Sequence, residues 1–458
     1  MTRAAPVIGV WGHYADANLG DDACPTALVH HLKRLVPSAS FVLFCRFPKI
    51  AAARWGLPAH PVRPLSPGES GPRELPSPLL PGAAQHAADV PRWRARARAI
   101  PLLRAVVRGA RVIVDCGRAL PAELSFFWQS YRRLRGIDLL VVAGSNPLFD
   151  FFGGFWGYPY RTWQWALLAR LRGARVAFVS VGAGPIVSAR SGRLLARVLR
   201  RADYVSFRDE GSRRLMRQYG FAGPDHVCPD LAQSLPSDVR PGTRSEHLRV
   251  GINPMIVHHK TFWPVTDPDL QRRYMQSLAA LAARLVASGH DVFFYGTQTS
   301  DQVTAEETRA AMRAAAPALQ LPAFVMPASV TQLLQLCASC DLLVTTRFHG
   351  AIFGVVTARP TLAICYQAKT REVLEAAGLG AHAIDFEHVS AERLGAAFDR
   401  LRAERHSVET RLRQHTIELR ARLDRQYEQI AQVVGSEATD DLSFPYHSRR
   451  PDVAGTLS

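Results

Sequence analysis

The stretch Asp341-Leu-Leu-Val-Thr-Thr-Arg347-Phe-His349-Gly350 decides how the C-terminal half of this chain folds. Its apolar, β-branched residues predict a short buried strand, and the small and apolar residues of 350–357 predict a helix directly after it. Arg347 and His349 are then expected on the turn between strand and helix. Open α/β sheets bind ligands at such turns, where the free N–H groups and positive dipole end of the helix favour an anion.

A second apolar run, residues 361–366, ends just before Lys369. We expect it to form another strand of the same sheet, which places Arg347, His349 and Lys369 at one edge. Cationic and proton-handling side chains gathered at one edge predict an anionic substrate, and phosphate is the anion that such an edge suits best.

The size and composition of the chain indicate a globular protein of more than one domain. It has 458 residues, of which 47% are hydrophobic and 21% charged. No apolar run reaches the ~18 residues of a membrane helix, and the first residues lack the pattern of a signal peptide. The seven cysteines are scattered, as expected for reduced thiols. We therefore expect a cytoplasmic protein.

The net charge of +17 comes mostly from arginine, with dense runs at 92–98 and 190–201. Solvated helix faces explain such runs most simply. Contact with the inner face of a membrane is the second interpretation, because anionic lipids attract basic segments. No nucleic-acid-binding signature accompanies the charge, so no nucleic-acid partner is expected.

Strand-like runs alternate with helical patterns, which predicts a parallel α/β architecture. The expected strands are 7–11, 41–44, 112–115, 139–143, 176–181 and 204–207, then 249–253, 292–295, 323–326, 342–346 and 362–365. We expect two Rossmann-like domains facing a cleft. Their predicted extents are 1–240, with a Pro-rich insertion at about 58–91, and 241–390, followed by C-terminal helices over 391–435 and a flexible tail over 436–458.

The first predicted strand leads into Asn18-Leu-Gly20-Asp21-Asp22, with a helix expected from about Ala23. A glycine there lets the backbone approach a ligand, and Asp21 or Asp22 can cap the helix or accept a sugar hydroxyl. The motif alone is a turn with a cap. Its position at the carboxyl end of a strand makes it a candidate for the binding of a substrate.

Arg208-Asp209, with Ser212 in the following helix, is a further candidate at a strand end. A structural ion pair explains Arg208 and Asp209 as well as ligand binding does. Asp230 follows another strand-like segment and can orient a nearby arginine. The histidines show no spacing typical of a metal site, so no metal is expected.

With these residues assembled, the chain resembles the polysaccharide pyruvyl transferase family over roughly residues 5–380. The most specific matches are Arg347-Phe-His349-Gly350 and Tyr366 with Lys369. The weaker matches, in order along the chain, are Asn18-Leu-Gly20-Asp21, Phe207-Arg208-Asp209 with Ser212, and Asp230. The resemblance implies a GT-B-like fold and transfer of pyruvate from phosphoenolpyruvate, as co-substrate, onto a sugar of a cell-envelope or exopolysaccharide glycan. No other cofactor is expected.

For the site, we expect Arg347 and Arg208 to anchor the anionic donor, with Lys369 as a third cation. His349 is expected to act as general acid or to stabilise the phosphate, and Asp21 to bind an acceptor hydroxyl. One segment departs from the family. A glycine triplet usually follows the strand at 139–143, whereas this chain has Ala143-Gly144-Ser145, which puts details of the acceptor side in question.

Two other functions fit parts of the pattern. A nucleotide-sugar-dependent GT-B glycosyltransferase has the same architecture and also uses cations in its C-terminal domain. A non-catalytic glycan-binding or scaffold protein is compatible with the altered segment at Gly144, although the presence of Arg347, His349 and Lys369 argues against it. The acceptor is expected to be a glycan or a lipid-linked sugar.

Overall fold

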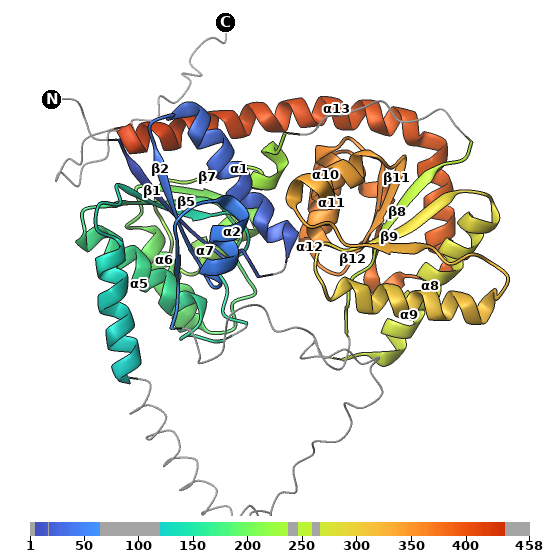
Figure 1. Ribbon diagram of the computed structural model, residues 1–458, viewed down its shortest axis with the longest axis horizontal. Helices are drawn as coiled ribbons and strands as arrows, with labels where there is room; N and C mark the ends of the chain where they lie inside the picture. The colour runs from blue at the N-terminus through green and yellow to red at the C-terminus, as the bar shows by residue number, and fades with distance from the viewer. Residues whose placement is uncertain are drawn as a thin grey trace, which may run out of the picture.

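A computed structural model describes residues 5–16, 18–64, 120–151, 153–236, 246–258 and 266–435. They form two parallel β-sheets, each covered by helices on both faces (Figure 1). The two Rossmann-like domains expected from the alternating sequence pattern are confirmed. The predicted strand at 112–115, most of the Pro-rich insertion and the C-terminal tail lie outside the described residues.

The N-terminal sheet has the strand order β3-β2-β1-β4-β5-β6-β7. Its strands are β1 (Val7–Trp11), β2 (Ser40–Cys45), β3 (Ala59–Pro61), β4 (Leu139–Ala143), β5 (Arg175–Val181), β6 (Tyr204–Phe207) and β7 (His226–Val227). The helical elements are α1 (Leu19–Leu35), α2 (Pro48–Trp55), α5 (Tyr158–Leu171), α6 (Ala189–Leu199), α7 (Glu210–Gln218) and the short η1 (Leu231–Ser234), and residues 120–133 are also helical. Apolar residues of α1 pack on one face of the sheet, and those of α5 and α6 pack on the other.

The C-terminal sheet has the order β10-β9-β8-β11-β12-β13. Its strands are β8 (Arg249–Asn253), β9 (Asp291–Tyr295), β10 (Ala323–Val325), β11 (Leu342–Thr345), β12 (Thr361–Cys365) and β13 (Ala383–Asp385). Its helices are α8 (Pro268–Ala287), α9 (Asp301–Ala315), α10 (Val330–Ala338), α11 (Phe348–Val356) and α12 (Ala368–Ala376), with short turns η2 (Gly380–His382) and η3 (Phe386–His388).

A single long helix, α13 (Ala391–Gly435), crosses both domains (Figure 1). Its early residues, such as Phe398, join the core of the C-terminal domain, and its last turns, such as Tyr427, join the core beside α1. The Gln426 side chain is buried and contacts the hydroxyls of Ser206 (2.6 Å) and Ser180 (2.9 Å) in the N-terminal sheet. The helix thereby connects the two domains.

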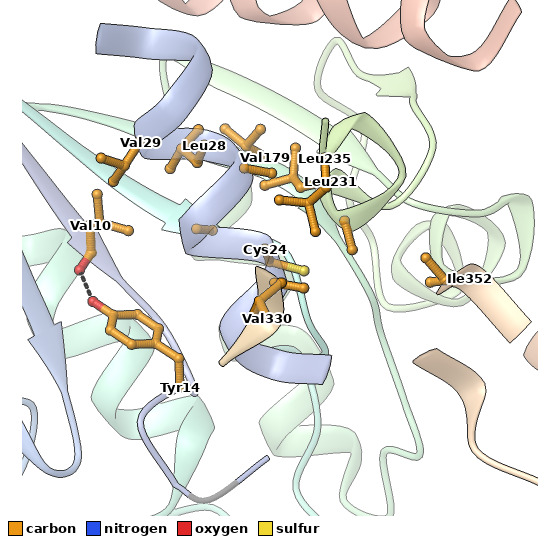
Figure 2. Packing of buried hydrophobic residues seen from close by; sticks show 14 of the residues in the cluster. Val10, Tyr14, Cys24, Leu28, Val29, Val179, Leu231, Leu235, Val330 and Ile352 are labelled. Atoms are coloured by element: carbon orange, nitrogen blue, oxygen red, sulfur yellow. Dashed lines mark hydrogen bonds between the residues drawn. The ribbon is translucent and has the colours of Figure 1, made fainter. Parts of the chain in front are cut away.

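The two domains also share an apolar core around α1. Figure 2 shows Cys24 and Leu28 of α1 beside Leu231 of η1, with Val330 of α10 and Ile352 of α11 contributed by the C-terminal domain. All five side chains are 6% exposed or less. Removing this apolar surface from water favours the arrangement in which the domains are in contact.

The sequence predictions were wrong at several helix starts, at one short strand, and over 391–435, where the predicted C-terminal helices are the single helix α13. The first helix begins at Leu19, capped by Asn18, whose side chain accepts from the Gly20 N–H, so neither Asp21 nor Asp22 is the cap. The helix expected from residue 350 begins at Phe348, which puts His349 in its first turn. A short strand, β3, occupies residues 59–61, where the Pro-rich insertion was expected to begin. Capping is decided by local side-chain bonds that apolar periodicity does not reveal.

Gln426→Ala should destabilise the protein by about 1–3 kcal/mol, because it removes the buried acceptor of the Ser206 hydroxyl and the buried donor to the Ser180 hydroxyl. Chemical denaturation measures the change in free energy of unfolding. The neighbouring exposed residue Glu428, changed to alanine, is the matched control and should have little effect. Equal losses in both variants would contradict the proposed anchoring role of Gln426.

Candidate functional site

Several of the predicted site residues lie at the points where each sheet reverses its strand order, and Arg208, Asp230 and Lys369 follow strands farther along the sheets. In the N-terminal sheet the reversal falls between β1 and β4, and in the C-terminal sheet between β8 and β11. Such points leave space for a ligand at the carboxyl ends of the strands. The Asn18–Asp21 segment follows β1, Gly144 follows β4, and Arg347 follows β11.

Arg347 is the N-cap residue of α11 and makes a buried ion pair with Asp301, the first residue of α9. Its Nε lies 2.9 Å from Asp301 Oδ1, and its Nη2 lies 3.2 Å from Ser300 Oγ. Burial opposes the charged form, but the adjacent Asp301 carboxylate keeps the pKa of Arg347 raised. The charge of Arg347 is therefore largely compensated within the protein, and its geometry is fixed.

Asp301 also holds the loop that reaches the other domain. Its Oδ2 accepts from the backbone N–H groups of Thr297 (2.9 Å) and Gln298 (3.1 Å). The carbonyl of Thr297 in turn accepts from Leu19 N at 2.8 Å, at the start of α1. One buried carboxylate thus connects Arg347 to the first turn of α1.

Arg208 and Lys369 meet on the ring of Phe348. The Arg208 guanidinium carbon lies 4.8 Å from the ring centroid, and Lys369 Nζ lies 4.9 Å from it. Cation–π contact with a buried ring stabilises each charge, and this ring brings a cation from each domain together. Arg208 also contacts Asp209 (Nε to Oδ2, 3.3 Å) and Asp230 (Nη1 to Oδ2, 3.6 Å).

Lys369 lies in the first turn of α12. Burial, followed by repulsion from the Arg208 guanidinium, lowers the pKa of Lys369 to about 7. Its ammonium group makes no ion pair with another described residue at salt-bridge distance. The pKa of Lys369 lies close to neutral pH, so a bound anion, which stabilises the charged form, would shift this lysine toward its protonated state.

His349 lies against the first turn of α1. A Cβ at Gly20 would come 2.4 Å from His349 Nδ1, so only glycine permits this approach. Within the described residues, His349 Nε2 and Asp230 Oδ2 are buried without a hydrogen-bond partner. Burial lowers the pKa of His349, against the opposing effects of Asp230 and Asp21, so the neutral imidazole is favoured at neutral pH. An anion bound nearby would favour the protonated ring.

Asp21 faces polar groups of the N-terminal domain. Its carboxylate accepts from Asn18 Nδ2 (2.7 Å) and from Ser145 Oγ (3.0 Å), and His13 Nε2 lies 4.0 Å away. Gly144 and Ser145 both have positive φ, at 44° and 56°. Ser145 thus takes a conformation that favours glycine and supplies a hydroxyl to Asp21, which gives the departure from the glycine triplet a local role.

Several predicted site residues are held in structural contacts. Ser212 Oγ accepts from Ala183 N at 2.9 Å, and Asp209 caps α7 by accepting from Ser212 N at 2.6 Å. A Cβ at Gly350 would come 2.0 Å from Thr345 Oγ1, so that glycine allows α11 to pack on its own strand. Gly144 similarly packs against Cys24. These residues position the turns that carry Arg208, His349 and Asp21.

Donor atoms of Cys24, Asp230 and His349 lie within 4.8 Å of one another, a combination of residue types that also occurs in metal sites. Cys24 Sγ already donates to Asp230 Oδ1 at 3.2 Å, and the Arg208 guanidinium contacts the other oxygen. A further cation would be repelled by Arg208 and Lys369. The absence of a metal stays a prediction.

Sequence reasoning missed Asp301, Cys24 and Ser145 as members of this region. The sequence could have indicated Asp301, because an acidic residue at the start of the helix after β9 is a typical helix-start pattern at the edge of the sheet where ligands bind. Ser145 was noted as part of the altered glycine segment, but its contact with Asp21 was not predicted. Cys24 carried no signal, since its position depends on how α1 packs against β4 and η1.

The chain belongs to the polysaccharide pyruvyl transferase family, which residues 18–367 match. A search of curated protein sequences finds no match. None of the helices among the described residues has both the length and the hydropathy that a membrane span requires.

Solved structures with a similar fold include glycosyltransferases and epimerases, all distant in sequence. Anabaena HepE in complex with UDP and glucose has a TM-score of 0.52 at 11% identity, covering 93% of this chain and 99% of that one. The Neisseria meningitidis UDP-GlcNAc 2-epimerase bound to UDP-GlcNAc has a TM-score of 0.52 at 8% identity, covering 94% and 99%. A Rickettsia africae glycosyltransferase has a TM-score of 0.51 at 9% identity, covering 94% and 99%. These similarities confirm the GT-B-like fold.

The titration of Lys369 should be visible in anion binding. Sulfate keeps a constant charge near neutral pH, so its dissociation constant should rise by up to about tenfold between about pH 6.5 and about pH 8 as Lys369 loses its proton. Isothermal titration calorimetry measures this directly. Lys369→Arg stays charged and should show a clearly weaker dependence on pH, with the remainder coming from protonation of His349. The assignment fails if the wild type shows no such dependence.

Proposed function

We propose that this chain transfers the pyruvyl group of phosphoenolpyruvate onto a sugar of a cell-envelope or exopolysaccharide glycan, forming a ketal and releasing phosphate. The observation that carries the proposal is the meeting of Arg208, Lys369 and His349 around Phe348 in a member of this family. Phosphoenolpyruvate carries a phosphate and a carboxylate, which together require more than one cationic anchor.

In this proposal Arg208 and Lys369 are the direct anchors of the donor. Both lie at helix starts and face the same aromatic ring, and neither is locked by a short bidentate pair. Arg347, which the sequence suggested as an anchor, is already paired with Asp301. Its charge is largely compensated by that carboxylate, and its role in this proposal is to hold the loop at residues 297–298 through Asp301.

The reaction adds two sugar hydroxyls to one carbon of the donor. Protonation of the vinyl carbon makes the oxygen-bearing carbon electrophilic, a first hydroxyl attacks it, the phosphate leaves, and a second hydroxyl closes the ring. One hydroxyl proton replaces the proton given to the vinyl carbon, and the other leaves with phosphate. His349 supplies the proton or stabilises the leaving phosphate, once the bound anion has favoured its protonated form, and Lys369 assists.

The acceptor side is assigned to the N-terminal domain. Asp21 and Asn18 are held at the carboxyl end of β1, next to the His349 ring. A carboxylate there can accept a hydrogen bond from a sugar hydroxyl and orient it toward the donor. The sugar belongs to a glycan or to a lipid-linked intermediate, and the protein works in the cytoplasm without a bound cofactor. Contact with the membrane is taken up in the next subsection.

A nucleotide-sugar-dependent glycosyl transfer is the competing function, since HepE and the epimerase adopt the same fold with UDP or a UDP-sugar bound. A structural similarity at this low sequence identity establishes the fold but not the substrate. The family match over residues 18–367 favours pyruvyl transfer.

His349→Ala should lower pyruvyl transfer by about 10²-fold or more, because it removes the proposed proton donor. Carbon-13-labelled phosphoenolpyruvate and a glycan extract, followed by NMR of the new ketal methyl group, give the readout. His388→Ala changes an exposed histidine of η3 and should leave transfer unchanged. Near-normal transfer by a folded His349 variant would exclude this role.

Chelation of divalent metals should leave pyruvyl transfer unchanged, because the proposed mechanism neutralises the donor with Arg208 and Lys369. The same NMR assay after dialysis against EDTA tests this expectation. Loss of activity that added zinc restores would instead assign a metal to Cys24, Asp230 and His349.

A further inference from the structure

A line of aromatic residues runs along the outer side of α5. Trp156 is 72% exposed and lies edge-to-face with Tyr160 at 5.3 Å, and Tyr160 in turn contacts Trp163 at 5.8 Å. The same helix side continues to Leu167 and to Leu171, which is 61% exposed. Trp156 and Leu171 are exposed and Tyr160, Trp163 and Leu167 between them are half-buried, and a connected row of large apolar side chains at the surface can mark a contact region.

This row borders a groove between α5 and α6 with a volume of about 270 Å³. Its floor is apolar, formed by Trp163, Ala166, Leu167, Val176 and Val198, and its edges carry Arg170, Arg197 and Arg201. Arg170 pairs with Asp203, whereas the exposed Arg197 and Arg201 form no ion pair with another described residue. Exposed Arg190 and Arg193 extend the basic side along α6.

We propose that the α5–α6 surface, defined by Trp156, Trp163, Leu171, Arg197 and Arg201, binds an anionic lipid bilayer. Tryptophan rings, and arginine side chains with their apolar stems, partition to the boundary between headgroups and acyl chains. Each arginine is also attracted electrostatically to the anionic phosphate of the headgroups. The aromatic and aliphatic side chains along α5 would contact the acyl chains, and the arginines along α6 would contact the anionic headgroups. Peripheral binding of this kind combines both terms.

The surface approaches the acceptor side of the candidate site at the start of α5, whereas Leu171, Arg197 and Arg201 lie toward the opposite edge of the N-terminal sheet. Tyr158, at the start of α5, hydrogen-bonds His13 Nδ1, and His13 lies 4.0 Å from Asp21. If the proposed function holds, a bilayer touching the start of α5 would hold a lipid-linked sugar on the side of Asp21. The membrane contact itself does not depend on that function, and it is tested without measuring catalysis.

Co-sedimentation of the full chain with vesicles of phosphatidylcholine and phosphatidylglycerol in a three-to-one ratio tests the proposal. The wild type should bind these vesicles, bind pure phosphatidylcholine vesicles at least about tenfold more weakly, and be released by high salt. Arg197→Ala/Arg201→Ala should weaken binding by about tenfold or more, and Trp156→Ala/Leu171→Ala should also weaken it.

Matched controls lie on α13, where Arg402 and Ile417 are also exposed. Arg402→Ala and Ile417→Ala should bind vesicles as the wild type does, and melting temperatures should show that all variants are folded. Absence of wild-type binding, or equal losses in the α13 variants, would overturn the proposal. So would preferential binding of a single-stranded RNA by the same arginines. If the wild-type protein binds vesicles but shows no pyruvyl transfer, the proposed function is contradicted and the proposed membrane contact is not.

Discussion

The buried Asp301 carboxylate is the constraint on which the arrangement of the site depends. It accepts from Arg347 on one side and from the N–H groups of Thr297 and Gln298 on the other. The Thr297 carbonyl then accepts from Leu19 at the start of α1. Because the first turn of α1 is fixed in this way, its Gly20 lies against His349, and side chains from both domains come together.

The charged form of Lys369 is disfavoured at the interface between the two domains. Arg208 and Lys369 share the ring of Phe348, and burial with their mutual repulsion lowers the pKa of Lys369 to about 7. The nearby carboxylates of Asp21, Asp209 and Asp230 offset part of the charge. An incoming dianion or trianion relieves that repulsion, which favours donor binding and protonation of Lys369 and His349 together. Anion binding and proton supply are therefore physically coupled.

Much of the fold followed from sequence because parallel strands carry short apolar runs. The strand at 342–345 was predicted from its short run of apolar, β-branched residues, and Arg347 was correctly expected at the end of that strand, whereas His349 lies in the first turn of the helix. The pairing of Arg347 with Asp301 could not be predicted, since it joins the ends of two strands whose order in the sheet is set by packing. The close approach of Gly20 to His349 likewise depends on how the domains meet. Helix starts were displaced by a few residues because caps such as Asn18 act locally.

The most direct test of the account is calorimetric titration of the wild-type protein with phosphoenolpyruvate and, separately, with UDP and GDP. The account predicts saturable binding of phosphoenolpyruvate that is lost in Lys369→Gln, with no binding of either nucleotide at the same concentrations. Binding of UDP or GDP without phosphoenolpyruvate binding would contradict it. That result would instead indicate a nucleotide-sugar-dependent glycosyltransferase.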